Sequence, residues 1–190
     1  MTAAPHLDLV TVEEYFSAEE ASEVKHEYVG GVVYAMSGGT FGHSAIATNA
    51  LASLGGQLRG KRCRVLNSDM KVRIQFPTHT RFYYPDVSVV CSKPSEESTY
   101  YDEPTVVIEV LSPSTRRTDE GEKKDAYLTI PSLAVYMLVE PEAPAVVVYR
   151  RGDQGFGREV FQDPNAVIPL PEIEAELRLS ELYDSIGETE

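Results

Sequence analysis

The chain has 190 residues and a formal net charge of −13, with 42% hydrophobic and 25% charged residues. This composition excludes a disordered or fibrous chain. No apolar run reaches the about 20 residues of a membrane span, and the N-terminus lacks the basic and apolar segments of a secretory signal. We therefore expect one cytoplasmic domain over residues 1–190, with its core at about 25–150 and no membrane partner.

Cysteine usage is low. Cys63 and Cys91 each lie in an apolar, strand-like stretch. In a reducing compartment, such cysteines are expected to remain thiols and to pack as small core residues.

Charge is unevenly distributed along the chain. Residues 8–27 and 172–190 each hold seven acids and one base, whereas residues 59–81 have an excess of six positive charges. The basic residues of this segment are Arg59, Lys61, Arg62, Arg64, Lys71, Arg73 and Arg81. A basic stripe of this density can follow a phosphate backbone, or it can be the solvated face of a helix end and a strand. The sequence leaves both interpretations open.

The N-terminal third predicts a helix, a hairpin and a second helix. Thr11 is placed as the N-cap of a helix over 12–20. The strand-like runs 26–29 and 32–36 flank a two-glycine turn, which is typical of a β-hairpin. Further on, an apolar stripe predicts an amphipathic helix. This stripe consists of Ala47, Leu51, Leu54 and Leu58, with His43 one turn ahead of it.

The remainder predicts strands around one further helix. Residues 69–76 alternate between apolar and polar, as in a half-buried strand, while 84–91 and 105–111 are typical of buried strands. A helix is expected over 116–129, despite Gly121, followed by a strand over 133–139 that should run parallel to 105–111. Shorter strands are expected at 145–149, 158–161 and 166–168. The predicted fold class is α/β, with a mixed β-sheet flanked by helices.

One acid stands out in this pattern. Glu109 lies inside the apolar strand Val106–Leu111. Because burying an unpaired charge costs several kcal/mol, this carboxylate requires a cation, a hydrogen-bond network or access to solvent. If 84–91 and 104–111 pair symmetrically as a hairpin, Cys91 lies opposite Pro104 and Asp86 opposite Glu109. Two adjacent carboxylates favour a hard divalent cation, although Asp86 alone fits a simple Pro-Asp turn.

These segments resemble the PD-(D/E)xK phosphodiesterase superfamily, and more closely the Uma-two family, which is assigned to the restriction endonucleases. The resemblance covers roughly residues 25–140. It is carried by His26–Gly31, the helix with His43, Tyr84–Val90, Ile108–Thr115 and the run from Asp119 through Lys123 to Tyr127. It implies a restriction-endonuclease-like fold, with an extra N-terminal hairpin and extra C-terminal strands.

The resemblance departs from the superfamily pattern at one position, because Leu111 stands where the motif lysine is expected. It implies that the lysine has moved to the following helix, at Lys123. Lys124 is a rival for this role. Alternatively, Asp119 and Lys123 form an ordinary exposed pair one helical turn apart.

Four other residues are more ambiguous. The resemblance makes Glu27 the third acid of the site, although it can equally be an exposed strand carboxylate. His43 fits a packed core residue better than a base. It remains, with Lys71 and Arg73, a candidate for contacting nucleic acid.

The sequence therefore predicts a Mg²⁺-dependent endonuclease acting on nucleic acid, most simply DNA, with Mn²⁺ as a possible substitute. Asp86, Glu109 and the carbonyl of Val110 would hold the metal, helped by Glu27, and Lys123 would complete the catalytic set. By analogy with the fold, a homodimer is expected. The alternatives are an inactive binding or assembly module of the same fold and a hydrolase of a smaller phosphodiester.

Overall fold

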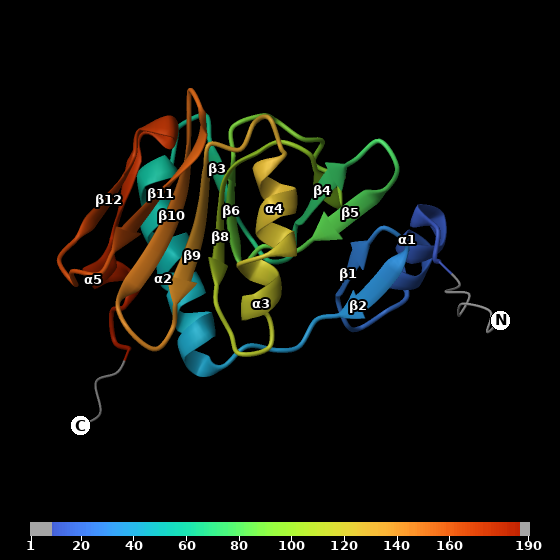
Figure 1. Ribbon diagram of the computed structural model, residues 1–190, viewed down its shortest axis with the longest axis horizontal. Helices are drawn as coiled ribbons and strands as arrows, with labels where there is room; N and C mark the ends of the chain where they lie inside the picture. Colours follow the sequence, from blue (N-terminus) through green and yellow to red (C-terminus); the bar gives the residue numbers. More distant parts are fainter. Residues whose placement is uncertain (1–8, 187–190) are drawn as a thin grey trace.

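The computed structural model describes residues 9–186 and arranges their strands in three sheets (Figure 1). The central sheet has six strands in the order β11-β10-β9-β8-β6-β3, and only its β8–β9 pair is parallel. Its strands are β3 (Arg64–Asn67), β6 (Val87–Val90), β8 (Pro104–Val110), β9 (Val135–Glu140), β10 (Ala145–Gly152) and β11 (Gly155–Phe161). The predicted mixed α/β fold is confirmed, while the predicted domain limits lie outside the described residues.

Helices cover both faces of the central sheet. The long helix α2 (Phe41–Leu58) packs on one face together with α5 (Leu179–Leu182). The short helices α3 (Arg116–Asp119) and α4 (Glu122–Leu128) connect β8 to β9 and pack on the other face (Figure 1). None of the helices in the part of the chain that the structure describes is long and apolar enough to cross a membrane.

A second sheet of five strands lies beside the first, in the order β2-β1-β5-β4-β7 (Figure 1). Its strands are β1 (His26–Val29), β2 (Val32–Ala35), β4 (Lys71–Gln75), β5 (Thr80–Tyr83) and β7 (Tyr100–Tyr101). Helix α1 (Val12–Glu20) packs on it through an aromatic cluster of Tyr15, Tyr28 and Phe82. The predicted hairpin is confirmed, and it belongs to this second sheet.

The C-terminal part closes the α2 face of the central sheet. Strands β12 (Val167–Leu170) and β13 (Ala175–Arg178) form a two-stranded sheet, joined by the 3-10 helix η1 (Pro171–Ile173). Ile168 and Leu177 pack into the same core as α2. The sequence predicted a strand at 166–168 but indicated neither β13 nor α5.

Three predicted elements need correction. The buried stripe of α2 runs through Ile46, Ala50, Leu54 and Leu58, so Ala47 and Leu51 are only partly buried. The predicted strand 84–91 begins only at Val87, because Pro85 cannot donate to a strand ladder. The predicted helix 116–129 is two helices, broken at Gly121, where a Cβ would lie 2.8 Å from the Arg117 carbonyl oxygen.

The cysteine prediction is also wrong, because Cys63 and Cys91 form a disulfide. Arg64 pairs with Val90 at the end of the β3–β6 ladder, so the next residues outward are the two cysteines. The sequence pattern did not indicate this ladder and therefore could not bring the two thiols together.

We expect reduction of this disulfide to lower the free energy of unfolding by about 3 kcal/mol, because the bond closes a loop of 28 residues in the unfolded chain. Urea unfolding of oxidised protein, with and without dithiothreitol, measures this change. The double variant Cys63→Ser, Cys91→Ser is the control and should not respond to the reductant. Two reactive thiols in denatured, non-reduced protein would contradict the disulfide.

Candidate active site

A lysine ammonium lies between carboxylates where the two large sheets meet. Lys123 Nζ is 3.0 Å from Glu27 Oε1 and 3.0 Å from Glu109 Oε1. Asp119 Oδ1 lies 3.7 Å from the same nitrogen. The structure therefore brings Glu27, Glu109 and Lys123 together, and it adds Asp119.

The alternation of β8 explains why Glu109 faces this cluster. Val106, Ile108 and Val110 point into the core beneath α2, whereas Val107 belongs to the core beneath α4. Since successive side chains of a strand point to opposite faces, Glu109 lies on the α4 face with Val107. It is only 2% exposed.

The helix break at Gly121 separates the elements that carry Asp119 and Lys123. Asp119 ends α3, and Lys123 lies in the first turn of α4. Both are buried, at 2% and 5% exposure, so the alternative of an ordinary exposed pair is wrong. Lys124, the rival lysine, instead donates to the Glu120 carbonyl at 2.8 Å and pairs with Asp125.

Glu27 reaches the cluster from the second sheet. It lies on β1, and its Oε1 accepts a hydrogen bond from the Tyr84 backbone N–H at 3.3 Å in addition to its contact with Lys123. Tyr84 belongs to the segment that leads from β5 into β6. The carboxylate of Glu27 therefore joins the two sheets.

Asp86 lies directly before β6, beside the cluster. Its Oδ2 accepts a hydrogen bond from the Val110 N–H at 2.8 Å. Val87 pairs with Ile108, so the same register, continued by one residue, places Asp86 opposite Glu109 as the sequence predicted. The predicted pairing of Cys91 with Pro104 is wrong, because an irregularity after Val89 pairs Val90 with Pro104.

His43 is the second basic group beside these acids. Its Nε2 lies 3.3 Å from Asp86 Oδ2, and this contact raises the pKa of the imidazole against the opposing effect of burial. The ring also lies close to Gly39, where a Cβ would be 2.7 Å from His43 Nδ1. His43 is therefore half-buried against an acid, rather than packed in the core as its place on the apolar stripe favoured.

The cluster has more acid than base. Burial raises the pKa of Glu109 well above its usual range, and the nearby charges of Asp119, Asp86 and Glu27 add to this effect against the opposing Lys123 ammonium. Burial likewise raises the pKa of Asp119. For Lys123, burial lowers the pKa, but the negative charges of Glu109 and Glu27 outweigh it and raise the pKa well above its usual value, which favours the ammonium form.

Two buried oxygens of this region lack a hydrogen-bond partner among the described residues. They are Glu109 Oε1, which lies near the ammonium without hydrogen-bond geometry, and the hydroxyl of Tyr127. The pKa of that hydroxyl is raised by burial and by the charge of Glu109. Nothing in the apolar pattern around Tyr127 distinguished this hydroxyl from an ordinary core tyrosine.

The structure does not bring the other predicted contact residues to the cluster. Lys71 is buried and donates to the Tyr84 hydroxyl at 3.0 Å. Arg73 forms a two-pronged pair with Asp102 at 2.7 Å for each contact. Nucleic-acid contact by these residues and by His43 stays a prediction.

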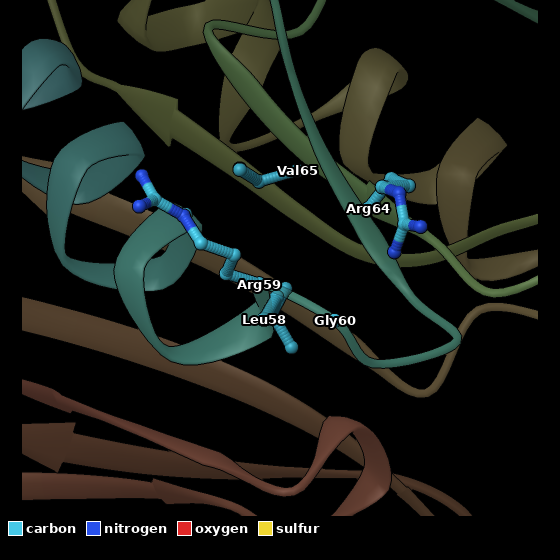
Figure 2. A pocket seen from close by; sticks show the side chains of 6 residues that line it. Leu58, Arg59, Gly60, Arg64 and Val65 are labelled. Carbon is cyan, nitrogen blue, oxygen red and sulfur yellow. The ribbon is translucent and has the colours of Figure 1, made fainter.

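Other members of the basic segment 59–81 are also engaged within the protein. Arg81 pairs with Glu122 at 3.0 Å, and Lys61 donates to the Glu174 carbonyl. Arg59 and Arg64 line a hollow of about 280 Å³, and their guanidinium groups lie on opposite sides of it (Figure 2). None of the carboxylates of the cluster lines this hollow.

The raised pKa of Glu109 predicts a pH dependence of stability. Between its unfolded pKa of about 4.3 and its higher folded pKa, the folded protein holds a proton that the unfolded chain has lost. The free energy of unfolding should therefore fall as pH rises through this window. Glu109→Gln should weaken this fall, as measured by urea unfolding in EDTA from about pH 5 to about pH 8. The exposed Glu23→Gln is the control, and equal slopes for both variants would contradict the burial effect.

Comparison with known proteins places this chain in a family. Residues 12–181 match the family model described as "Uma2: Putative restriction endonuclease". Two relatives are uncharacterized proteins of Synechocystis sp., slr1290 and sll1609. The first is 39% identical over 145 residues, 75% of each chain. The second is 27% identical over 164 residues, 84% of this chain and 92% of the relative.

A solved structure agrees with the family match. It is a crystal structure described as a "putative nuclease belonging to DUF820" from Anabaena variabilis. It aligns with a TM-score of 0.74 and 25% identity, covering 92% of this chain and 97% of the other. Since the family model also spans almost the whole described chain, this protein belongs to the Uma2 family and shares the fold of the DUF820 structure.

Proposed function

We propose that the protein is a metal-dependent endonuclease that hydrolyses phosphodiester bonds of DNA. The observation that carries this proposal is the cluster itself. Glu27, Glu109 and Asp119 surround one buried ammonium, and Asp86 lies on the strand beside Glu109. Family membership and the nuclease fold support the reaction class.

The cluster fits a divalent cation by charge and by donor chemistry. Four carboxylates face one lysine and one histidine, and Glu109 Oε1 lacks a hydrogen-bond partner among the residues from 9 to 186. Carboxylate and carbonyl oxygens are the ligands preferred by Mg²⁺ and Mn²⁺. The described side chains are not arranged as a ready-made group of three metal ligands. Instead, the acids are gathered around Lys123.

We assign metal binding to Asp86 and Glu109 with the carbonyl of Val110, and Glu27 completes the acidic set. When bound, such an ion polarises the phosphate and activates water. The N–H of Val110 already fixes one oxygen of Asp86, and Lys123 fixes one oxygen each of Glu27 and Glu109. The protein thus holds its acids in place before substrate binds.

Lys123 supplies the fixed positive charge of the reaction. The oxygen of a water molecule forms a bond to phosphorus and that water gives up a proton, while the bond from phosphorus to the leaving sugar oxygen breaks and the leaving oxygen takes up a proton. Negative charge on the phosphate oxygens grows during this step. An ammonium that stays protonated stabilises this charge and orients the water, which is the role of the motif lysine that Leu111 cannot perform.

The substrate and setting follow from the proposed activity. DNA is the simplest substrate for a member of a restriction endonuclease family, and we place the protein in the cytoplasm as a homodimer, in which two sites can cut paired strands. The Cys63–Cys91 disulfide does not support this compartment, since such bonds are more frequent in oxidising ones.

The second candidate is a binding or assembly module of this fold without turnover. Two observations favour it. Lys123 is already paired with two carboxylates, and much of the basic segment 59–81 is engaged within the protein rather than free for phosphate. A module of this kind has no need for a metal.

We expect the native protein to cleave plasmid or single-stranded DNA as Mg²⁺ or Mn²⁺ is added. Asp86→Ala, Glu109→Gln and Lys123→Met should each lower the rate by about 100-fold or more, because each removes either a candidate metal ligand or the ammonium beside it. Lys124→Met is the matched control and should retain the native rate, since the contacts of this lysine within the described residues are with Glu120, Asp125 and the Tyr149 ring. Absence of cleavage by native protein, or equal cleavage by Asp86→Ala, would refute the nuclease.

Calorimetry with Mn²⁺ separates the two candidates independently of turnover. The endonuclease should bind the ion, and Glu109→Gln should abolish the binding heat while Lys124→Met leaves it unchanged. Native protein that binds no Mn²⁺ at millimolar concentration would favour the assembly module.

A further inference from the structure

A separate pocket of about 560 Å³ lies between α1, the segment that follows it and the start of β4. Lys71 and Tyr84 line it, together with Phe16 and the rim residues Glu20 and Glu23. None of Asp86, Glu109 and Lys123 takes part in it. The proposed reaction therefore makes no use of this pocket.

Lys71 is the unusual residue of this pocket. It is 6% exposed, and its one hydrogen bond within residues 9–186 goes to the Tyr84 hydroxyl at 3.0 Å. No carboxylate of the described chain lies within ion-pair distance of it. Aromatic faces surround the nitrogen, with the Tyr84 ring at 5.1 Å and the Phe16 ring at 5.4 Å. Since an ammonium has three N–H donors, two remain for a ligand that accepts hydrogen bonds.

The aromatic rings stabilise the charge of Lys71 but do not accept its N–H groups as an oxygen would. Burial lowers the pKa of this lysine, which agrees with an ammonium short of partners. Such a group gains most from a ligand that brings a carbonyl oxygen or a ring nitrogen into the pocket.

Three acids in the lining limit the class of ligand. Glu19, Glu20 and Glu23 line the pocket together with a second cation, Lys25, whose ammonium is already held by Asp69 and the Ser68 carbonyl. Glu19 is occupied by the Tyr84 hydroxyl at 2.7 Å and by His26, whereas Glu20 and Glu23 are exposed. Their charges repel a phosphate, and their oxygens accept amino groups. The ligand should therefore be neutral and present both an acceptor and an amino donor.

Guanine and cytosine meet both conditions, because each carries a carbonyl oxygen and an exocyclic amino group. Adenine lacks the carbonyl, and thymine lacks the amino group. Phe16 is only partly buried and supplies an aromatic surface against which a flat base can stack.

The pocket is connected to the candidate active site through one short segment. Tyr84 faces the pocket with its ring and donates its backbone N–H to Glu27 in the cluster at 3.3 Å. Asp86 follows two residues later. A base bound beside Tyr84 is therefore two residues along the chain from Asp86, the candidate metal ligand.

We propose that this pocket binds an unpaired guanine or cytosine base of the nucleic acid, with Lys71 donating to its carbonyl oxygen and a rim glutamate accepting from its amino group. This inference rests on the proposed function and names the base class that the enzyme would receive. A base must leave a duplex stack to enter such a pocket, so the favoured substrate has unpaired bases near the cut.

The test is a titration of ¹⁵N-labelled protein with each of the four deoxynucleosides in EDTA, followed by amide chemical shifts. Deoxycytidine and deoxyguanosine should shift the amides of α1 and residues 21–25, whereas deoxyadenosine and thymidine should bind at least about tenfold more weakly. Lys71→Met should weaken binding of the first two by a similar factor, and Lys124→Met should not.

The double variant Glu20→Gln, Glu23→Gln changes only exposed side chains and keeps the test decisive if Lys71→Met fails to fold. It should also reduce binding of deoxycytidine. Absence of shifts with all four nucleosides, equal binding of the four, or native binding by both variants would overturn the proposal. This titration involves neither metal nor cleavage. If no nucleoside binds, the proposed nuclease activity is therefore unaffected. If nucleosides bind but the protein does not cleave DNA, only the proposed nuclease activity is refuted.

Discussion

The arrangement of the chain around the candidate site depends on one buried ion cluster, in which the Lys123 ammonium lies between the carboxylates of Glu27 and Glu109. A buried carboxylate on a central strand is unfavourable unless a counter-charge reaches it. The lysine reaches it from α4, and a second acid reaches the lysine from the other sheet. Three separate elements are thereby fixed relative to one another by a single nitrogen atom.

Lys123 holds the acids of this cluster in place but does not neutralise their combined negative charge. Asp119 and Asp86 add negative charge that Lys123 cannot balance alone, and the ion pair of His43 within the described residues is with Asp86. Burial and the neighbouring acids raise the pKa of Glu109, and Glu109 and Glu27 raise the pKa of Lys123 against the effect of burial. An excess of acid around a fixed ammonium is compatible with a site that receives a cation and a phosphate group, and it has no evident benefit for folding alone.

Much of the fold follows from local patterns in the sequence. The N-cap at Thr11, the glycine turn of the hairpin and the alternation of β4 each act over a few residues, and the structure contains the corresponding elements. The helix break at Gly121 was missed, because the helical pattern of the sequence continues across this glycine, whereas its backbone leaves the helical conformation and has no room for a Cβ beside the Arg117 carbonyl. The disulfide was missed for a similar reason, since it requires the register of two strands that are distant in sequence.

In the candidate site, too, some features follow from local sequence patterns and others depend on contacts between distant segments. The apolar run around Glu109 is visible in the sequence, and symmetric pairing was enough to place Asp86 beside it. The approach of Glu27 depends on how two sheets dock, which no periodicity reports, so only the family resemblance indicated it. Asp119 looked like a surface residue because its spacing from Lys123 is that of an exposed helical pair. The burial of both residues depends on helices that pack on the sheet.

Because Glu27 comes from the five-stranded sheet, the charge balance of the cluster depends on how the two large sheets are placed. If that sheet moved away from α4, Lys123 would lose one of its two nearest counter-charges, and Glu27 would lose its contacts with both Lys123 and Tyr84. Separating the five-stranded sheet from α4 would therefore also expose the charges of Glu27 and Lys123. Any ligand that binds these acids together also holds the two large sheets together, and its binding raises the free energy of unfolding.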